Sequence, residues 1–289
     1  MKNPDSPVWF VTGSGTGFGR QIVERALAEG CHVVTTALKQ SEVADLQEQY
    51  PDRALALELN VNDPKRCAEA IEEATQHFGR IDVLVNAAGY PYFTALEEGV
   101  DEDARRLFET QFWGPVNLIK AVLPQMRERR SGNIVNFSSI GGFTGFAANT
   151  YYCAAKHAVE GMSKALDIEV KPLGVRVTII EPGSFQTGFM QVMRHNSPIE
   201  ISDYADTAGF YRRVPGDVKL PGDPVRGAKA IYDAVTSGDP PLHLPLGKEG
   251  YELSVQQYRY LLDNAEKLKD VSIGADFPEG QHPLDLQQA

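Results

Sequence analysis

The stretch Val8-Trp-Phe-Val-Thr-Gly-Ser-Gly-Thr-Gly-Phe-Gly19 decides the fold of this chain. Residues 8–11 form an apolar run with the length of a buried strand, and residues 20–28 have the apolar spacing of a helix. A glycine turn between them predicts a dinucleotide site, because glycine lets the backbone approach a pyrophosphate whose charge the helix N-terminus favours. The glycines Gly13, Gly17 and Gly19 have the order Gly-x-x-x-Gly-x-Gly. A glycine-rich turn without a ligand is the alternative interpretation.

Strand-like and helix-like segments alternate along the following sequence. The predicted strands are 8–11, 32–37, 54–59, 81–86, 133–138 and 175–180. The predicted helices are 20–28, 41–50, 63–77, 101–130 and 150–171, and Pro124 is expected to kink or end a segment of the fourth. This alternation predicts an α/β fold with a doubly wound parallel sheet and helices on both faces. Ligands of such sheets bind beyond the carboxyl ends of the strands.

Composition restricts the classes of partner. The 289 residues include 28 basic and 39 acidic side chains, a net charge of −11, which disfavours nucleic acid and anionic membranes. No apolar run approaches the ~20 residues of a membrane span, and the first seven residues lack the apolar core of a secretory signal. We therefore expect a cytoplasmic protein with a single domain over residues 1–289. It would include a substrate lid at about 184–215 and a C-terminal helix and tail at about 248–289.

The cysteines and histidines predict no metal site, because neither set has metal-ligand spacing. Cys153 stands beside Tyr152 and is interpreted as a small buried helix residue rather than as a nucleophile.

Tyr152 and Lys156 lie four residues apart in the run TYYCAAKH, on one face of the predicted helix. A nearby ammonium favours the phenolate and lowers the tyrosine pKa from its ordinary ~10, which gives a general acid/base near neutral pH. Tyr151 is the rival, but its partner four residues on is Ala155. The spacing alone is also compatible with a surface pair.

Together these motifs resemble the short-chain dehydrogenase/reductase family over roughly residues 6–250. The matching motifs are the turn 12–19, Asn86-Ala-Ala-Gly89, Ser138-Ser139, Tyr152-x-x-x-Lys156, and Pro182-Gly183 followed by Thr187. The stretches 203–209 and 240–247 are similar to the hydroxysteroid- and retinol-dehydrogenase-like branch. The resemblance implies a Rossmann-type fold, a nicotinamide cofactor, a small-molecule carbonyl or alcohol substrate, and a homodimer or homotetramer.

The resemblance also implies catalytic roles. Tyr152 would be the acid/base, Lys156 would lower its pKa and hold the nicotinamide ribose, and Ser139 would bind the reacting oxygen. Ser138 is the alternative to Ser139, since adjacent strand residues point to opposite faces. Gln111 stands where the family has an asparagine that supports a proton relay, and it adds one methylene. This departure keeps open a second function, a catalytically silent dinucleotide-binding sensor.

The cofactor site implied by the resemblance extends along the carboxyl ends of the strands. Its expected residues are Gly13, Gly15, Thr16, Gly17, Phe18, Gly19, Ala37, Leu38, Lys39, Asn60, Val61, Asn86, Ala87, Ala88, Gly89, Tyr152, Lys156, Pro182, Gly183 and Thr187. Asn60 and Ala87 replace an aspartate and an asparagine of the family pattern. No acid follows the second predicted strand, and Lys39 would attract a 2′-phosphate, which favours NADP(H) over NAD(H). A solvated loop lysine is the alternative interpretation of Lys39.

The substrate is expected to be medium-sized and largely apolar, because aromatic residues and methionines follow Gly183. They are Phe185, Phe189, Met190, Met193, Tyr204, Phe210 and Tyr211. A lid helix is predicted over 199–213. The expected substrate contacts are Ser139, Tyr152, Tyr92, Phe185 and Phe189; packing of the lid on the core is the alternative role for the aromatic residues.

Overall fold

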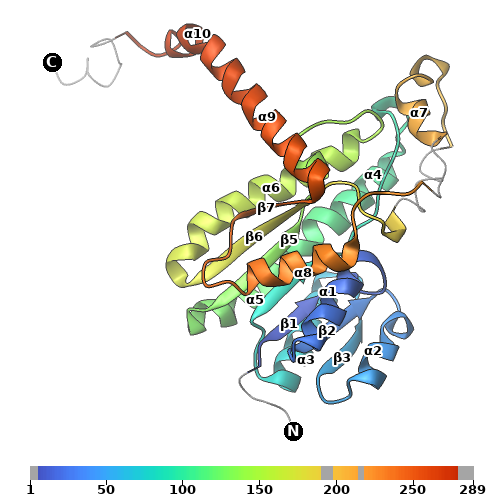
Figure 1. Ribbon diagram of the computed structural model, residues 1–289, viewed down its shortest axis with the longest axis vertical. Helices are drawn as coiled ribbons and strands as arrows, with labels where there is room; N and C mark the ends of the chain where they lie inside the picture. Colours follow the sequence, from blue (N-terminus) through green and yellow to red (C-terminus); the bar gives the residue numbers. More distant parts are fainter. Residues whose placement is uncertain (1–5, 190–197, 214–217, 279–289) are drawn as a thin grey trace. The chain divides into compact units, whose positions relative to one another are not determined.

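The computed structural model describes residues 6–189, 198–213 and 218–278. The chain divides into two units, residues 1–251 and 252–289, and each is described by itself. The first unit contains a seven-stranded sheet (Figure 1). Its strands are β1 Val8–Val11, β2 His32–Ala37, β3 Ala54–Glu58, β4 Val83–Asn86, β5 Gly132–Phe137, β6 Val175–Pro182 and β7 His243–Leu246.

All neighbouring strands of the sheet are parallel, in the order β3-β2-β1-β4-β5-β6-β7. The chain builds outward from β1 in one direction as far as β3 and then returns to continue on the other side with β4. The loops after β1 and β4 therefore open in opposite directions at the carboxyl edge, which is where ligands of doubly wound sheets bind. The predicted α/β fold is confirmed.

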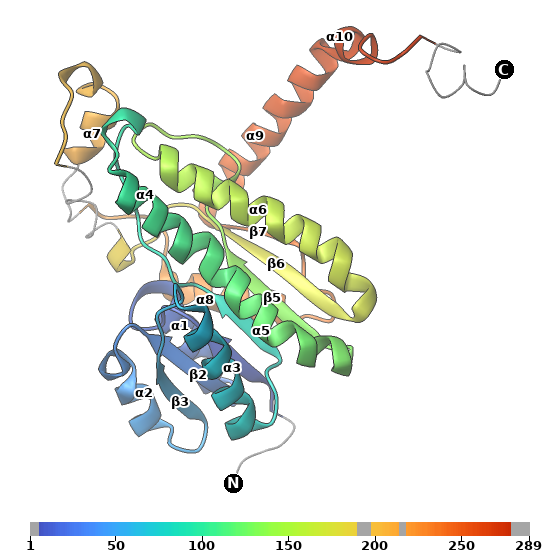
Figure 2. The ribbon, with the colours of Figure 1, turned by 180° about the vertical axis from the view of Figure 1, so that it is seen from behind.

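Helices cover both faces of this sheet (Figures 1 and 2). The helices of the first unit are α1 Gly17–Ala28, α2 Ala44–Gln49, α3 Pro64–Phe78, α4 Asp101–Phe108, α5 Gly114–Arg129, α6 Thr150–Val170, α7 Ala208–Arg212 and α8 Pro224–Val235. One apolar core lies between the sheet and helices α1 and α8. A second core lies between the opposite face and helices α3, α5 and α6.

The side chains of the strands point alternately into the two cores. Trp9 and Val11 of β1 belong to the first core, and Phe10 between them belongs to the second. Successive side chains of a strand point to opposite faces, so a fully buried strand is apolar throughout, as β1 is.

The long helix predicted over 101–130 differs from the observed structure. A π-helical segment, Glu109–Trp113, separates α4 from α5, whereas α5 continues through Pro124. Helix α5 does not end at Pro124, so of the two expectations for this residue, a kink or a helix end, the helix end is wrong. The interruption lies at the segment that contains Gln111.

Two elements of the first unit were not predicted, and the lid differs from expectation. β7 and α8 had no predicted counterpart. Over 199–213 the structure has a short 3-10 turn, Ser202–Tyr204, and the five-residue helix α7 rather than one helix. Residues Met190 and Met193 of the predicted lid lie outside the described residues.

The predicted C-terminal helix is present. Helix α9, Gly247–Lys267, begins at the end of the first unit, and α10, Lys269–Ile273, follows within the second. Among the described residues, no helix is both long enough and apolar enough to cross a membrane. A single domain over 1–289 stays a prediction.

Candidate active site

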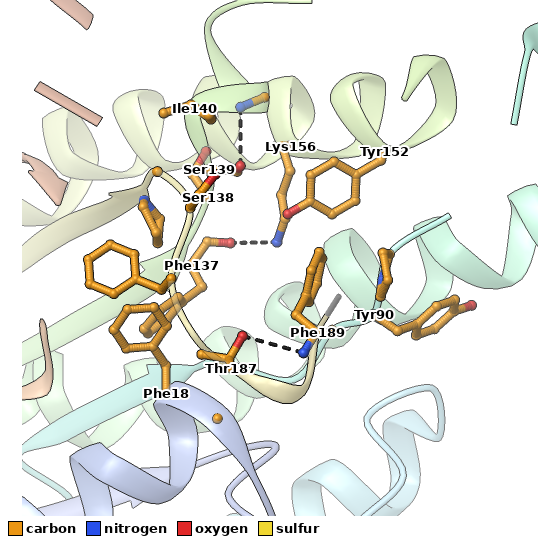
Figure 3. Close-up of a pocket in the computed structure, with 18 of the residues that line it drawn as sticks. Phe18, Tyr90, Phe137, Ser138, Ser139, Ile140, Tyr152, Lys156, Thr187 and Phe189 are labelled. Atoms are coloured by element: carbon orange, nitrogen blue, oxygen red, sulfur yellow. Dashed lines mark hydrogen bonds between the residues drawn. The ribbon is translucent and has the colours of Figure 1, made fainter. Parts of the chain in front are cut away.

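A cavity of about 670 Å³ opens at the carboxyl ends of the strands (Figure 3). Its walls come from the glycine turn after β1, the loop after β4, the end of β5, helix α6 and the loop after β6. The predicted site residues that line it are Gly13, Thr16, Gly17, Phe18, Gly19, Ala87, Gly89, Ser139, Tyr152, Lys156, Pro182, Gly183, Phe185, Thr187 and Phe189. The structure thus brings together residues that are up to 176 positions apart in the sequence, from Gly13 to Phe189.

The glycine turn is held tightly against the loop after β4. Gly13 has a φ of +64°, and a Cβ on it would lie 2.7 Å from Cα of Ala88. The hydroxyl of Thr12 accepts hydrogen bonds from the backbone N–H groups of Ala87 and Ala88, at 3.0 and 3.1 Å. Only glycine fits such a left-handed position against neighbouring backbone. Its close contact therefore fixes the relative positions of the two cofactor loops.

The N-terminus of α1 is suited to an anionic group. Thr16 precedes the helix but makes no side-chain capping bond, and the first turn contains no acidic residue. The first N–H groups of a helix lack partners within it and favour negative charge. Gly17, Phe18 and Gly19 at this end line the cavity. These residues fit the pyrophosphate of a dinucleotide.

Asn86, one of the predicted cofactor residues, makes a hydrogen bond that joins two strands of the sheet. Its amide donates to Asn136 at 2.8 Å, and the amide of Asn136 donates to Ser163 at 2.9 Å. This buried line joins β4 and β5 to α6. Asn86 thereby positions the loop that carries Ala87, Ala88 and Gly89.

The residues expected around the adenosine lie apart from the cavity lining. Leu38 is 67% exposed and Lys39 is exposed, whereas Ala37 at the end of β2 is buried. Asn60 is exposed, and Val61 is buried against Gly114. Glu42 was not predicted as a site residue, yet a Cβ on Gly15 would lie 3.5 Å from its carboxylate oxygen Oε2. An acidic side chain therefore does lie beside the end of β2.

Three predicted catalytic side chains converge at the α6 side of the cavity (Figure 3). Nζ of Lys156 donates a 2.8 Å hydrogen bond to the carbonyl oxygen of Phe137 and lies 5.6 Å from the ring centroid of Tyr152. Oγ of Ser139 accepts from the N–H of Gly141 at 3.1 Å. The Ser139 hydroxyl lies near enough to the Tyr152 phenol to lower its pKa.

Burial dominates the acid–base behaviour of this group. It lowers the pKa of Lys156 to about 7, while the negative charge of Glu160 acts in the opposite direction. Burial raises the pKa of the Tyr152 phenol, and the neighbouring Ser139 hydroxyl partly offsets this. Burial dominates in this structure, because desolvation disfavours the charged forms of both side chains. A lowering of the Tyr152 pKa by Lys156 stays a prediction.

The alternatives to Tyr152 and Ser139 face other surroundings. The Tyr151 hydroxyl donates to the carbonyl oxygen of Leu96 at 3.0 Å, and its ring packs against Gly99 and Tyr92. Ser138 lines the cavity, but its hydroxyl lies beside Gly142 on the side of Glu160. The two serines thus face different partners, as expected for adjacent residues at a strand end.

Gln111 is buried in the π-helical segment. Its amide nitrogen donates to the carbonyl oxygen of Tyr90 at 2.6 Å, and its Oε1 has no hydrogen-bond partner among the described residues. The Gln111 side chain also contacts Gly89, within 4 Å of the position of a Cβ there. The amide therefore holds the loop after β4, and it does not line the cavity with Lys156.

Aromatic side chains line several parts of the cavity. The ring of Phe189 faces Tyr152 at 5.8 Å between centroids, and Phe185 packs against Phe18 at 4.8 Å. Tyr92 does not line the cavity: it is buried with Ala104 and Leu107, and its hydroxyl accepts from the N–H of Val100. The expectation that Tyr92 contacts the substrate is therefore wrong. Its neighbours Tyr90 and Phe93 line the cavity instead.

Comparison with known proteins agrees with this geometry. Residues 7–198 match the family described as short chain dehydrogenase. The chain belongs to this short-chain dehydrogenase family. It is an NAD(P)-dependent oxidoreductase of that family.

Other short-chain dehydrogenases resemble it over most of their length. A 3-ketodihydrosphingosine reductase from Bacteroides thetaiotaomicron is 35% identical over 261 residues, which cover 88% of this chain and 93% of the relative. The crystal structure of a short-chain dehydrogenase from Streptomyces avermitilis has a TM-score of 0.88 and 40% identity, covering 94% of this chain and all of that one. The structure of ElxO with NADP bound has a TM-score of 0.71 and 27% identity, covering 86% and 99% of the two chains.

Proposed function

We propose that the chain interconverts a secondary alcohol and a ketone, or an alcohol and an aldehyde, with Tyr152 as the acid/base. The observation that carries the proposal is the convergence of Tyr152, Ser139 and Lys156 on one cavity with the glycine turn. A dinucleotide held by that turn and a carbonyl compound beside Tyr152 would share this space. Proximity of this kind is what hydride and proton transfer require.

The nicotinamide cofactor supplies or accepts the hydride when it is bound. In reduction, the Tyr152 hydroxyl gives its proton to the carbonyl oxygen as the carbon gains the hydride; in oxidation, Tyr152 takes the proton back. The raised pKa of Tyr152 keeps the phenol protonated near neutral pH, which suits a proton donor. Ser139 would hydrogen-bond the same oxygen.

Lys156 acts on this reaction through position and charge. Its bond to the carbonyl oxygen of Phe137 holds the ammonium beside the Tyr152 ring. An ammonium at this place stabilises negative charge on the phenol after the proton has left. Its second expected role, contact with the nicotinamide ribose, is part of the proposal.

We favour NADP(H) over NAD(H) as the cofactor. Lys39 follows β2 and supplies positive charge, and the related ElxO is named as a complex with NADP. Glu42 is the opposing observation, because a carboxylate beside Gly15 would repel a 2′-phosphate and accept a hydrogen bond from a 2′-hydroxyl. Direct binding of NADPH and NADH to the same preparation decides between them.

The proposed substrate is a medium-sized, largely apolar carbonyl compound. Aromatic rings supply a large share of the cavity lining, and they include Phe93, Phe137, Phe146 and Phe189. A relative is named as the reductase of a keto compound, which supports a ketone. The hydroxysteroid- and retinol-dehydrogenase-like branch remains a prediction.

We also propose a homodimer or homotetramer formed through the helices that carry Gln111 and Tyr152. Trp113, at the end of the π-helical segment, is 47% exposed, and Ile168 of α6 is 77% exposed. Large exposed apolar side chains on these helices favour association. Light scattering on the purified chain measures the mass directly.

The proposed activity is tested by NADPH consumption with a panel of apolar ketones, aldehydes and quinones, and by NADP reduction with the matching alcohols. Turnover with any of these carbonyl compounds that requires Tyr152 supports the proposal. Tight cofactor binding without turnover across the panel would favour the catalytically silent sensor instead.

A further inference from the structure

A second cluster of chemically active side chains lies outside the cavity. Glu160 of α6, Glu181 of β6 and His243 of β7 each place one nitrogen or oxygen atom within 4.8 Å of the others. These three elements are neighbours: β6 pairs with β7, and α6 packs on β6 (Figure 1). None of the three residues lines the cavity described above. The proposed reductase chemistry does not use them.

The two carboxylates are deeply buried. Glu160 is 2% exposed and Glu181 is 0% exposed. Oε1 and Oε2 of Glu160 and Oε2 of Glu181 have no hydrogen-bond partner among the described residues. Burying carboxylates whose hydrogen bonding is incomplete is costly, and two together repel each other as well. The fold therefore places oxygen atoms with free lone pairs where a cation would stabilise them.

The cations already near the cluster compensate only part of this charge. Nδ1 of His243 lies 2.6 Å from Glu181 Oε1 and 3.9 Å from Glu160 Oε2. The ammonium of Lys164 lies 3.3 Å from Glu160 Oε2, but its side chain is 45% exposed. A half-exposed lysine can leave without a desolvation cost, so it is a replaceable counterion.

A fourth polar group points to the same place. The hydroxyl of Ser138, a residue that is 3% exposed, also has no hydrogen-bond partner by geometry among the described residues. A Cβ on Gly142 would lie within 2.2 Å of Ser138 Oγ and 3.2 Å from Glu160 Oε1. Glycine at this position thus lets a buried hydroxyl and a buried carboxylate both approach the same backbone turn.

We propose that Glu160, Glu181 and His243 form a binding site for a divalent transition-metal ion of the Zn²⁺ class. One imidazole nitrogen with two carboxylate oxygens is a ligand set that Zn²⁺, Co²⁺ and Mn²⁺ accept, whereas Mg²⁺ and Ca²⁺ prefer oxygen alone. The ion takes the place of the proton between His243 and Glu181, and its two charges balance the two carboxylates. The side chain of His243 is 33% exposed, which gives the ion a path from solvent.

The proposed site would be structural rather than catalytic. Glu160 lies one helical turn beyond Lys156 on α6, and Glu181 directly precedes Pro182-Gly183 of the cofactor loop. An ion bound to both would tie α6 to β6 and β7. It would thereby fix the spacing between the proton-transfer residues and that loop.

The test is a metal titration of the full chain after tag removal and treatment with a chelator. Zn²⁺ is added in competition with a chromophoric chelator, and Co²⁺ binding is followed by its visible absorption. We expect one ion per chain. Glu160→Gln and His243→Ala should each weaken binding by more than about tenfold, since each removes one of three protein ligands. His157→Ala is the matched control, because His157 is an exposed histidine on the same helix.

A second, independent test replaces the half-exposed Lys164 by methionine (Lys164→Met). Removal of the competing ammonium should tighten Zn²⁺ binding, an effect that a purely structural ion pair would not produce. Absence of stoichiometric binding by the folded wild-type chain would overturn the proposal. Equal affinity in wild type, Glu160→Gln and His243→Ala would also overturn it. These readouts do not depend on turnover, so the proposed oxidoreductase activity is tested separately.

Discussion

The ammonium of Lys156 donates a 2.8 Å hydrogen bond to the carbonyl oxygen of Phe137, the last residue of β5. This bond joins the helix that carries Tyr152 to the strand end that leads into Ser138 and Ser139. Lys156 is buried, so the bond also satisfies a charged donor that has left water. The proton-transfer residues are thus held by a contact between two elements of the fold.

Tyr152→Phe should remove the proton donor and leave cofactor binding intact. We expect turnover to fall by about 10²–10⁴-fold, the usual effect of general acid–base catalysis. Tyr151→Phe is the matched control, because the Tyr151 hydroxyl bonds to Leu96 away from Lys156. Steady-state rates and NADPH fluorescence titrations measure both effects. If the Tyr151 variant loses turnover and the Tyr152 variant keeps it, the assignment is wrong.

Lys156→Met should change how stability depends on pH. The folded-state pKa of Lys156 is about 7, whereas an unfolded lysine titrates at ~10.4, so the unfolded chain binds one more proton between these values. The lysine therefore contributes a stability that rises with pH by ~1.4 kcal/mol per pH unit over this window. Methionine removes that slope, so the variant should gain most relative to wild type near pH 7.

Urea unfolding of both chains at several pH values from 7 to 10 measures the difference. The lost bond to Phe137 adds an offset that does not vary with pH. Parallel stability curves for the two chains would show that Lys156 titrates normally in the folded state.

Glu42→Ala should shift cofactor selectivity toward NADP(H). Its carboxylate lies beside Gly15, where it would repel a 2′-phosphate. We expect a change of about tenfold in the ratio of NADPH to NADH affinity, equivalent to ~1.4 kcal/mol. Lys39→Ala should move the ratio in the opposite direction. Glu48→Ala, an exposed acid on α2, is the control and should leave the ratio unchanged.

Gln111→Leu should affect the loop after β4 more than the proton transfer. Its amide donates to the carbonyl oxygen of Tyr90, and loss of that bond leaves a buried acceptor unpaired at a cost of about 1–3 kcal/mol. Because Tyr90 lines the cavity, KM for the carbonyl substrate should rise while kcat changes little. Thermal unfolding and steady-state kinetics measure the two quantities. A fall in kcat at unchanged KM would instead place Gln111 in a proton relay.

The sequence predicted most of what depends on local spacing. The strand, glycine turn and helix at 8–28 are consecutive, so their apolar pattern and glycines identify them directly. β7 was missed because it is only four residues long and contains Pro245, which weakens a strand pattern. Its position next to β6 depends on pairing across more than 60 residues.

The site was predictable as a set of motifs and less so in its detail. Tyr92 was expected at the cavity in place of Tyr90, because the direction of a loop side chain is not encoded in spacing. The pKa of Tyr152 depends on burial by elements distant in sequence, which outweighs the partner four residues away. Glu160, Glu181 and His243 lie 21 and 62 residues apart, so only the folded sheet brings them together.

Pro245 has a consequence for how copies of this chain meet. The carbonyl oxygens of Leu242 and Leu246 accept hydrogen bonds from the N–H groups of Ile179 in β6 and of Gly183 just after it. The intervening odd-numbered positions of β7 therefore point their backbone groups outward. Proline has no N–H to offer there, and the outer border of β7 presents a broken row of donors. A second molecule cannot extend the sheet by continuous strand pairing at this border, which protects the chain against edge-to-edge aggregation.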